Sequence, residues 1–224
     1  MSQLHTHTTR KYVDTIVFVS IALALGILCF AIPLINSTYI SSDSFFGRNH
    51  QFFVGPAVNA ALVLAAIKVR GWVKVISLVM LPSISSIALG LWFAVGGLPM
   101  LYMVPAIWLG NTALVLAFKF IYNQGIKKQE PAPLYKNEPT SKKLKHTELR
   151  YSIAAIIGIG AKVGIIFGVF IILRSFGVFP TPAATAMWTV MGINQLITAT
   201  AGCIIAYGVV KTTHFIKSKK QVQV

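Results

Sequence analysis

Residues 151–173 read YSIAAIIGIGAKVGIIFGVFIIL and contain one charged side chain, that of Lys162. A helix of about 20 apolar residues is long enough to cross the hydrocarbon core of a bilayer, so this stretch predicts a transmembrane helix. The rest of the chain has a similar composition, because 55% of its 224 residues are hydrophobic and only 11% are charged. Soluble domains carry roughly 25% charged residues. We therefore expect an integral membrane protein.

Apolar stretches on both sides of residues 151–173 predict an all-α membrane protein, a bundle of six transmembrane helices. Polar residues are expected to form an N-terminal tail (1–12), a linker (123–150) and a C-terminal tail (211–224). The linker separates a four-helix part (13–122) from a two-helix part (151–210). Pro56 is expected in the first turn of the second helix. The expected spans are Val13–Ile35, Phe52–Ile67, Trp72–Val95, Leu98–Tyr122, Tyr151–Leu173 and Thr185–Val210.

The basic residues predict the orientation of this bundle. The chain has 20 Lys and Arg against 5 Asp and Glu. With six spans, Arg48 and Arg174 lie on one side, Lys162 lies within a span, and the other seventeen basic residues lie on the side of the termini. Because cytoplasmic loops are rich in Lys and Arg, both termini are expected in the cytoplasm. No basic patch alternates with aromatic residues, so nucleic acid is not an expected partner.

Two of the predicted helices carry nearly the same segment. Asn59-Ala-Ala-Leu-Val-Leu-Ala and Asn111-Thr-Ala-Leu-Val-Leu-Ala agree at six of seven positions. Both helices are expected to run inward, which places the two asparagines at similar depth in the outer half of the membrane. Asn194 and Gln195 are expected at comparable depth in the last helix. Amides in hydrocarbon need partners, so these side chains should face the bundle interior, where they serve either interhelical hydrogen bonds or a ligand.

Lys162 is expected about 13 Å into the fifth span, near the membrane midplane. No Asp or Glu lies deep within a predicted span, because Asp14 is at the inner end of the first helix and Asp43 is in the first outer loop. Three interpretations are open. The ammonium group contacts an anionic or carbonyl-rich ligand, pairs with amides or helix ends, or reaches back to the cytoplasmic interface.

Small residues predict close helix packing at two places. At 100° per residue, Lys162 points about 160° away from a glycine stripe on the same helix, so we expect the glycines against a neighbouring helix and the lysine toward a cavity. The stripe consists of Gly160, Gly164 and Gly168. A second set on the first helix either docks another membrane protein or packs internally, and comprises Ser20, Ala22, Ala24 and Gly26.

The sequence lacks the residue sets of common enzymes. It contains no Ser-His-Asp set, no paired carboxylates and no phosphate-binding Gly-Lys-Ser/Thr loop. His5 and His7 form a pair without further ligands, so no metal site is expected. We therefore expect neither catalysis nor a bound cofactor. A membrane enzyme that acts on lipids is the least favoured alternative.

Three segments resemble the S components of energy-coupling factor (ECF) transporters: Gly55-Pro56-Ala57-Val58-Asn59-Ala60, Val104-Pro105 through Leu109-Gly110-Asn111, and Asn194-Gln195-Leu196-Ile197-Thr198-Ala199. The resemblance extends over residues 13–210. It implies a subunit of a prokaryotic plasma membrane that captures a small vitamin-like micronutrient from outside. Such a subunit works with a transmembrane coupling subunit and two cytoplasmic ATPases. The family docks through Ala-x-x-x-Ala on the first helix, to which Ser20/Ala24 and Ala22/Gly26 are the nearest matches here.

The hypothesis is therefore a six-helix bundle that binds a small substrate in its outer half. Trp188 is either a lid that stacks on the substrate or an ordinary interfacial aromatic residue. The alternative is an accessory or scaffold subunit of a membrane complex, without a ligand, whose polar residues only hold helices together. The expected substrate-binding residues are Asn59, Asn111, Lys162, Trp188, Asn194 and Gln195.

Overall fold

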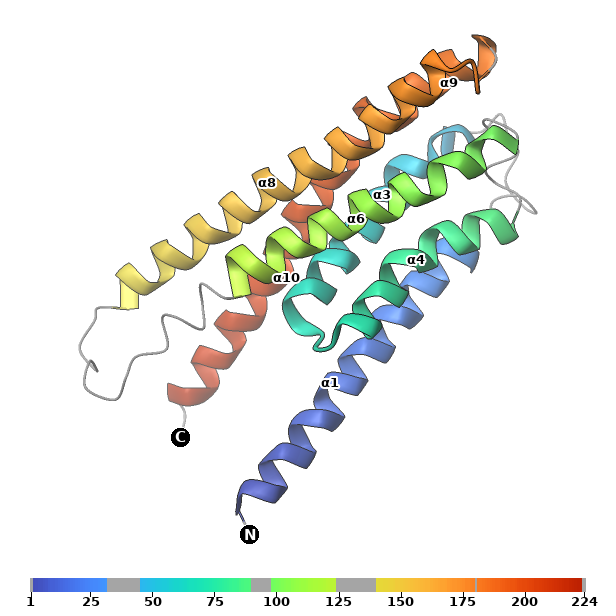
Figure 1. Ribbon diagram of the computed structural model, residues 1–224. Coiled ribbons are helices and arrows are strands. Elements are labelled where there is room, and N and C mark those ends of the chain that lie inside the picture. The colour runs from blue at the N-terminus through green and yellow to red at the C-terminus, as the bar shows by residue number, and fades with distance from the viewer. Residues whose placement is uncertain (1, 32–44, 90–97, 124–139, 180, 223–224) are drawn as a thin grey trace.

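The structure is a computed structural model that describes residues 2–31, 45–89, 98–123, 140–179 and 181–222, with the side chains of 13–29, 54–89, 98–123, 147–179, 184–185 and 187–213. Within these ranges every regular element is helical, as an all-α fold requires. Successive long helices run in opposite directions, and both termini lie at the same end of the bundle (Figure 1). We call this end the terminal end and the opposite one the far end. The helices are α1 (Ser2–Gly26), α3 (Phe45–Lys68), α4 (Trp72–Ala88), α6 (Val104–Ala117), α8 (Thr140–Ser175), α9 (Thr181–Met191) and α10 (Ile193–Val222).

Three helical stretches are long and apolar enough to cross a membrane: Leu98–Asn123, Thr147–Ser175 and Met187–Thr213. The first of them includes α6 together with a 3-10 helix (Leu98–Met103) and a π-helical turn (Phe118–Asn123). Shorter apolar helices lie at the other predicted spans, over Val13–Cys29, Val54–Lys68 and Trp72–Ala88. The three longer stretches are compatible with a multi-pass helical membrane protein.

Several helices begin or end at other residues than the apolar pattern predicts. The first apolar helix begins at Ser2, α8 begins at Thr140 and α10 continues to Val222, because polar residues such as Lys, Glu and Gln extend a helix readily. The prediction for Pro56 is wrong. α3 begins at Phe45, so this proline lies in the helix interior, where close neighbouring helices make a proline tolerable.

The helices α3, α6, α8 and α10 enclose the core, with contacts from α3 to α6, α6 to α8, α8 to α10 and α10 back to α3. The closest approaches are made at glycines. A Cβ added to Gly202 of α10 would lie 2.5 Å from Cβ of Asn59 on α3. One added to Gly110 of α6 would lie 2.8 Å from the Ile166 side chain on α8. α1 and α4 pack on the outside of this group.

The prediction for the glycine stripe of α8 is wrong. A Cβ added to Gly160, Gly164 or Gly168 would meet no described atom within 4 Å. The face that packs against α6 carries Gly158, Lys162 and Ile166 instead. The lysine and the stripe do lie on opposite faces, as the helical periodicity requires. It is the lysine face, however, that meets the neighbouring helix.

Candidate functional site

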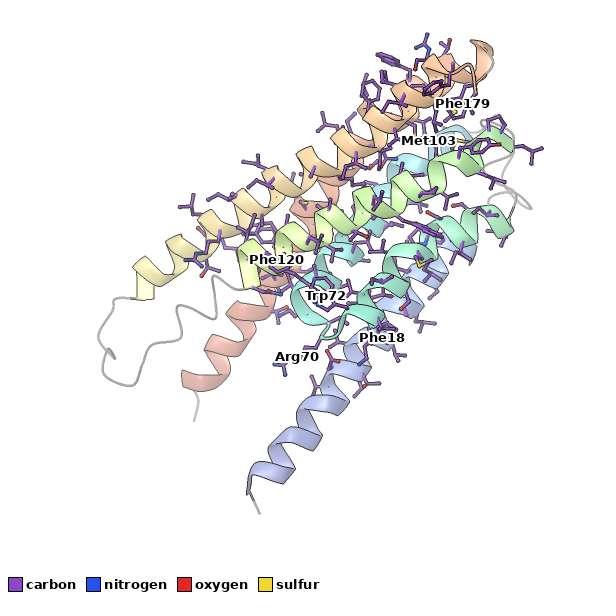
Figure 2. All side chains as sticks on the ribbon, viewed as in Figure 1. Phe18, Arg70, Trp72, Met103, Phe120 and Phe179 are labelled. Carbon is purple, nitrogen blue, oxygen red and sulfur yellow. The ribbon has the colours of Figure 1, made fainter. Side chains whose placement is uncertain are left out.

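The core contains two separate apolar clusters. The terminal-end cluster includes Leu62, Leu114 and Tyr151, and the far-end cluster includes Met103, Ile166 and Phe179. Figure 2 shows Met103 and Phe179 near the far end, and Trp72 and Phe120 toward the terminal end. Both clusters consist mainly of apolar side chains, so polar side chains near their boundary are of interest.

Such polar side chains occur at the boundary between the clusters on α6 and α8, and Asn59 of α3 lies beside terminal-end Ala60. On α6, Asn111 lies between far-end Ala106 and terminal-end Leu114. On α8, Lys162 lies between terminal-end Ala154 and far-end Ile166. We call this set the polar layer; its members are Asn59, Trp108, Asn111, Lys162, Asn194, Gln195 and Thr198.

Lys162 is the charged member of this layer and is buried, with 3% of its surface exposed. Its ammonium group donates a hydrogen bond to Oδ1 of Asn59. Asn59 is itself buried, and its Nδ2 donates to the Gly55 carbonyl oxygen over 2.9 Å. The amide is therefore oriented with its oxygen toward the lysine. The interpretation that Lys162 reaches the cytoplasmic interface is wrong, whereas pairing with an amide is confirmed.

The described carboxylates lie elsewhere. Asp14 accepts hydrogen bonds from the Arg70 backbone N–H over 2.7 Å and from Lys74 Nζ over 2.8 Å. Glu148 forms an ion pair with Lys211 at 3.3 Å. Among the described side chains, Lys162 thus has a neutral amide as its hydrogen-bond partner and no carboxylate. An ammonium group has three N–H donors, and removing it from water costs several kcal/mol, so this lysine has capacity for an anionic or carbonyl group.

The polar layer also contains two buried polar atoms without a hydrogen-bond partner among the described residues. One is Oδ1 of Asn111, which is 4% exposed, and the other is Nε1 of Trp108. These residues are three apart on α6, so they share one side of the helix. Each buried, unpaired polar group costs about 1–3 kcal/mol. The Asn111 oxygen can therefore accept a hydrogen bond and the Trp108 N–H can donate one, which suits a molecule that has both a donor and an acceptor. Trp108 was not among the predicted site residues, although its three-residue spacing from Asn111 indicates that the two side chains share one side of a helix.

The other predicted site residues lie at the edge of this arrangement. Asn194 and Gln195 are half-buried on α10, between far-end Met191 and terminal-end Cys203. The Thr198 hydroxyl, one turn further, donates to the Asn194 carbonyl oxygen over 2.7 Å. The structure therefore joins Asn59 directly to Lys162, whereas among the described residues no hydrogen bond links the Asn194 or Gln195 side chain to either of them.

Trp188 lies outside the polar layer. It is on α9, is 42% exposed, and packs edge-on against Phe167 with 4.8 Å between ring centres. The Arg174 guanidinium lies 5.5 Å from the centre of the Trp188 ring. A Cβ added to Gly192, in the turn between α9 and α10, would lie 3.1 Å from the Phe167 ring, so this glycine permits the turn to approach α8 closely. Trp188 thus belongs to an aromatic group at the far end.

The small residues of α1 divide between two environments. Ser20 and Ala24 are exposed, whereas Ala22 and Gly26 are half-buried. Ala22 packs against the terminal-end cluster. Of the two pairs at four-residue spacing, Ser20/Ala24 is therefore the one available on the surface of the chain.

Among the described residues, no group of three or more His, Cys, Asp or Glu side chains is placed to hold a metal ion. Cys29 and Cys203 are buried and free. The side chains of His5 and His7 lie outside the described residues. No family model, curated protein or solved structure matches the chain.

Proposed function

We propose that this chain is the substrate-binding subunit of an ECF-type importer in a prokaryotic plasma membrane. In this proposal it crosses the membrane six times, has both termini in the cytoplasm, and captures a small micronutrient from outside. A transmembrane coupling subunit and two ATPases then complete the transport. The observation that carries the proposal is the buried Lys162 ammonium, whose described hydrogen-bond partner is a neutral amide.

The chemistry of the polar layer favours a small ligand with a negative or carbonyl group. Such a group would supply the acceptors that the Lys162 ammonium needs. The unpaired Asn111 Oδ1 and Trp108 Nε1 would accept from and donate to the same molecule. Intramembrane charges that lack a counter-ion are characteristic of ligand and ion sites. Two apolar clusters on either side of the layer would then exclude water from the bound ligand.

The second candidate is a non-catalytic scaffold subunit, and the Lys162–Asn59 hydrogen bond favours it. In that case the bond would only join α8 to α3. The two candidates differ in whether the layer has an occupant, and in which proteins accompany the chain. A coupling subunit and ATPases are expected for an importer, whereas a different membrane complex is expected for a scaffold.

Native mass spectrometry of the gently purified protein tests the proposal. The wild type is expected to retain a small anionic or carbonyl-containing molecule, and Lys162→Met is expected to lose it. Lys211→Met is the matched control, because Lys211 is exposed at the terminal end and pairs with Glu148; it should retain the molecule. Equal retention by Lys162→Met would overturn the electrostatic role. A wild type without any small molecule, purified with an unrelated complex, would support the scaffold.

A further inference from the structure

The Lys162–Asn59 hydrogen bond joins two helices that do not otherwise pack together. In the group of four core helices, α3 and α8 lie diagonally opposite each other. Each packs against α6 and α10, and among the described residues the two share no close backbone contact. The long, flexible lysine side chain crosses the core to reach Asn59. The separation of α3 and α8 therefore depends on the helices that lie between them.

One segment of α10, Gly202 and Cys203, contacts both of these helices. On the α3 side, a Cβ added to Gly202 would lie 2.5 Å from Cβ of Asn59 and 2.9 Å from the Ala60 backbone nitrogen, so this glycine lets α10 lie directly against the α3 backbone. On the α8 side, the Tyr151 hydroxyl donates to the Cys203 carbonyl oxygen over 2.7 Å. Gly202 and Cys203 are both buried. α10 is therefore held to α3 and to α8 at neighbouring residues.

The Asn59 side chain is fixed at the same contact. Its Cβ lies against Gly202, its Nδ2 donates to the Gly55 carbonyl oxygen over 2.9 Å, and its Oδ1 accepts from Lys162. Polar groups of a binding site work only when they are held within about 0.5 Å of the required geometry. A displacement of α3 from α10 would therefore move the amide oxygen relative to the ammonium group.

We propose that Gly202 and Cys203 are positioning residues of the Lys162 site. Gly202 sets how closely α3 approaches α10, and the Cys203 carbonyl attaches α10 to α8. Together they hold the Asn59 oxygen at the Lys162 ammonium, so α10 acts on the site through its backbone. The inference rests on the proposed function as far as a ligand is concerned, but the placement of Asn59 against Lys162 can be tested without one.

Solid-state NMR of the protein in bilayers tests this placement. Lysine is labelled with ¹⁵N at Nζ and asparagine with ¹³C at Cγ, and dipolar dephasing reports pairs of these nuclei that lie close together. The Lys162–Asn59 signal is the dephasing that Lys162→Met removes. The wild type is expected to show this signal. Gly202→Ala is expected to lose most of it, because the added Cβ forces α10 away from α3.

Gly208→Ala is the matched control, because it makes the same substitution on the same helix and its Cβ meets nothing within 4 Å. It should keep the signal. Native mass spectrometry then measures the co-purified small molecule. Gly202→Ala is expected to retain it about ten-fold less than the wild type, the effect of losing one hydrogen bond to a charged group, whereas Gly208→Ala should retain it fully.

A Gly202→Ala variant that is less stable but keeps the Lys162–Asn59 signal would overturn the proposal, as would a wild type without the signal. A wild type that shows the signal, loses it in Gly202→Ala and carries no small molecule would support the positioning role and count against the proposed function. If Gly202→Ala does not fold, Tyr151→Phe decides, because it removes only the hydroxyl that holds α8 to α10. It should lower the signal, and an unchanged signal would overturn the proposal.

Discussion

The polar layer and the terminal end both contain lysines, but the lysines differ in burial and in the chemistry of their partners. At the terminal end, Lys74 lies 2.8 Å from the Asp14 carboxylate and Lys211 lies 3.3 Å from Glu148. In the polar layer, Lys162 is buried and bonds to the Asn59 amide. A charge near water can exchange one partner for another at little cost. A buried charge depends on the partners that the fold provides, so the same residue type is far more consequential in the layer.

The largest expected effect comes from removing the lysine's partner. Asn59→Leu leaves the buried ammonium without its amide oxygen and should lower the free energy of unfolding by about 3–5 kcal/mol. Thermal unfolding in mild detergent, followed by circular dichroism, measures this change. A loss under about 1 kcal/mol would mean that Lys162 finds another partner, and the contrast between the two regions would fail.

The second prediction concerns recovery of the stability that Asn59→Leu removes. Lys162→Met added to Asn59→Leu replaces the polar pair by apolar side chains of similar size. Such replacements are neutral or stabilising in ligand-free proteins, so the double variant should recover most of the lost stability, by about 3 kcal/mol relative to Asn59→Leu. The same unfolding assay applies, together with native mass spectrometry. Recovered stability with lost ligand would separate the binding role of the pair from its packing role.

The third prediction concerns Gly202, whose missing side chain leaves room for Asn59. Gly202→Ala places a Cβ 2.5 Å from Cβ of Asn59 and 2.7 Å from the Pro56 carbonyl oxygen. Overpacking of this kind costs about 1–3 kcal/mol. Gly208→Ala on the same helix is the control, because a Cβ there meets nothing within 4 Å and alanine favours helix by up to about 1 kcal/mol. Gly202→Ala is expected to lower the free energy of unfolding and Gly208→Ala to raise it. Changes of the same sign would contradict the close contact between α3 and α10.

The smallest effect is expected at the terminal end. Lys74→Gln removes the ion pair with Asp14, whose carboxylate keeps the Arg70 backbone N–H as a donor. Ion pairs of this exposure contribute roughly 0–1 kcal/mol and weaken in salt. Unfolding measured at low and high salt tests both points. A loss as large as that of Asn59→Leu would remove the distinction between the two regions.

The sequence predicted the helical class and the interior position of its polar residues, because apolar periodicity and the cost of amides in hydrocarbon act locally. Asn59 and Asn111 are buried as predicted, whereas Asn194 and Gln195 are half-buried. For Lys162 the sequence left open whether the side chain stays inside or reaches the interface, and the structure shows it buried. The sequence did not predict which face of α8 meets a neighbour. A glycine stripe and a lysine face are both compatible with a helix contact, and lipid does not distinguish them by hydrophobicity.

The sequence by itself determined a chain of apolar helices, and it predicted amides at similar depth on three of them and a lysine near the middle of a fourth. Only the tertiary structure decided that the lysine bonds to Asn59 rather than to Asn111, that Gly202 rather than Gly164 lies at a close contact, and that Trp108 joins the layer. The physical reason is that depth follows from position along one helix. Partners depend on how several helices rotate about their axes when they pack.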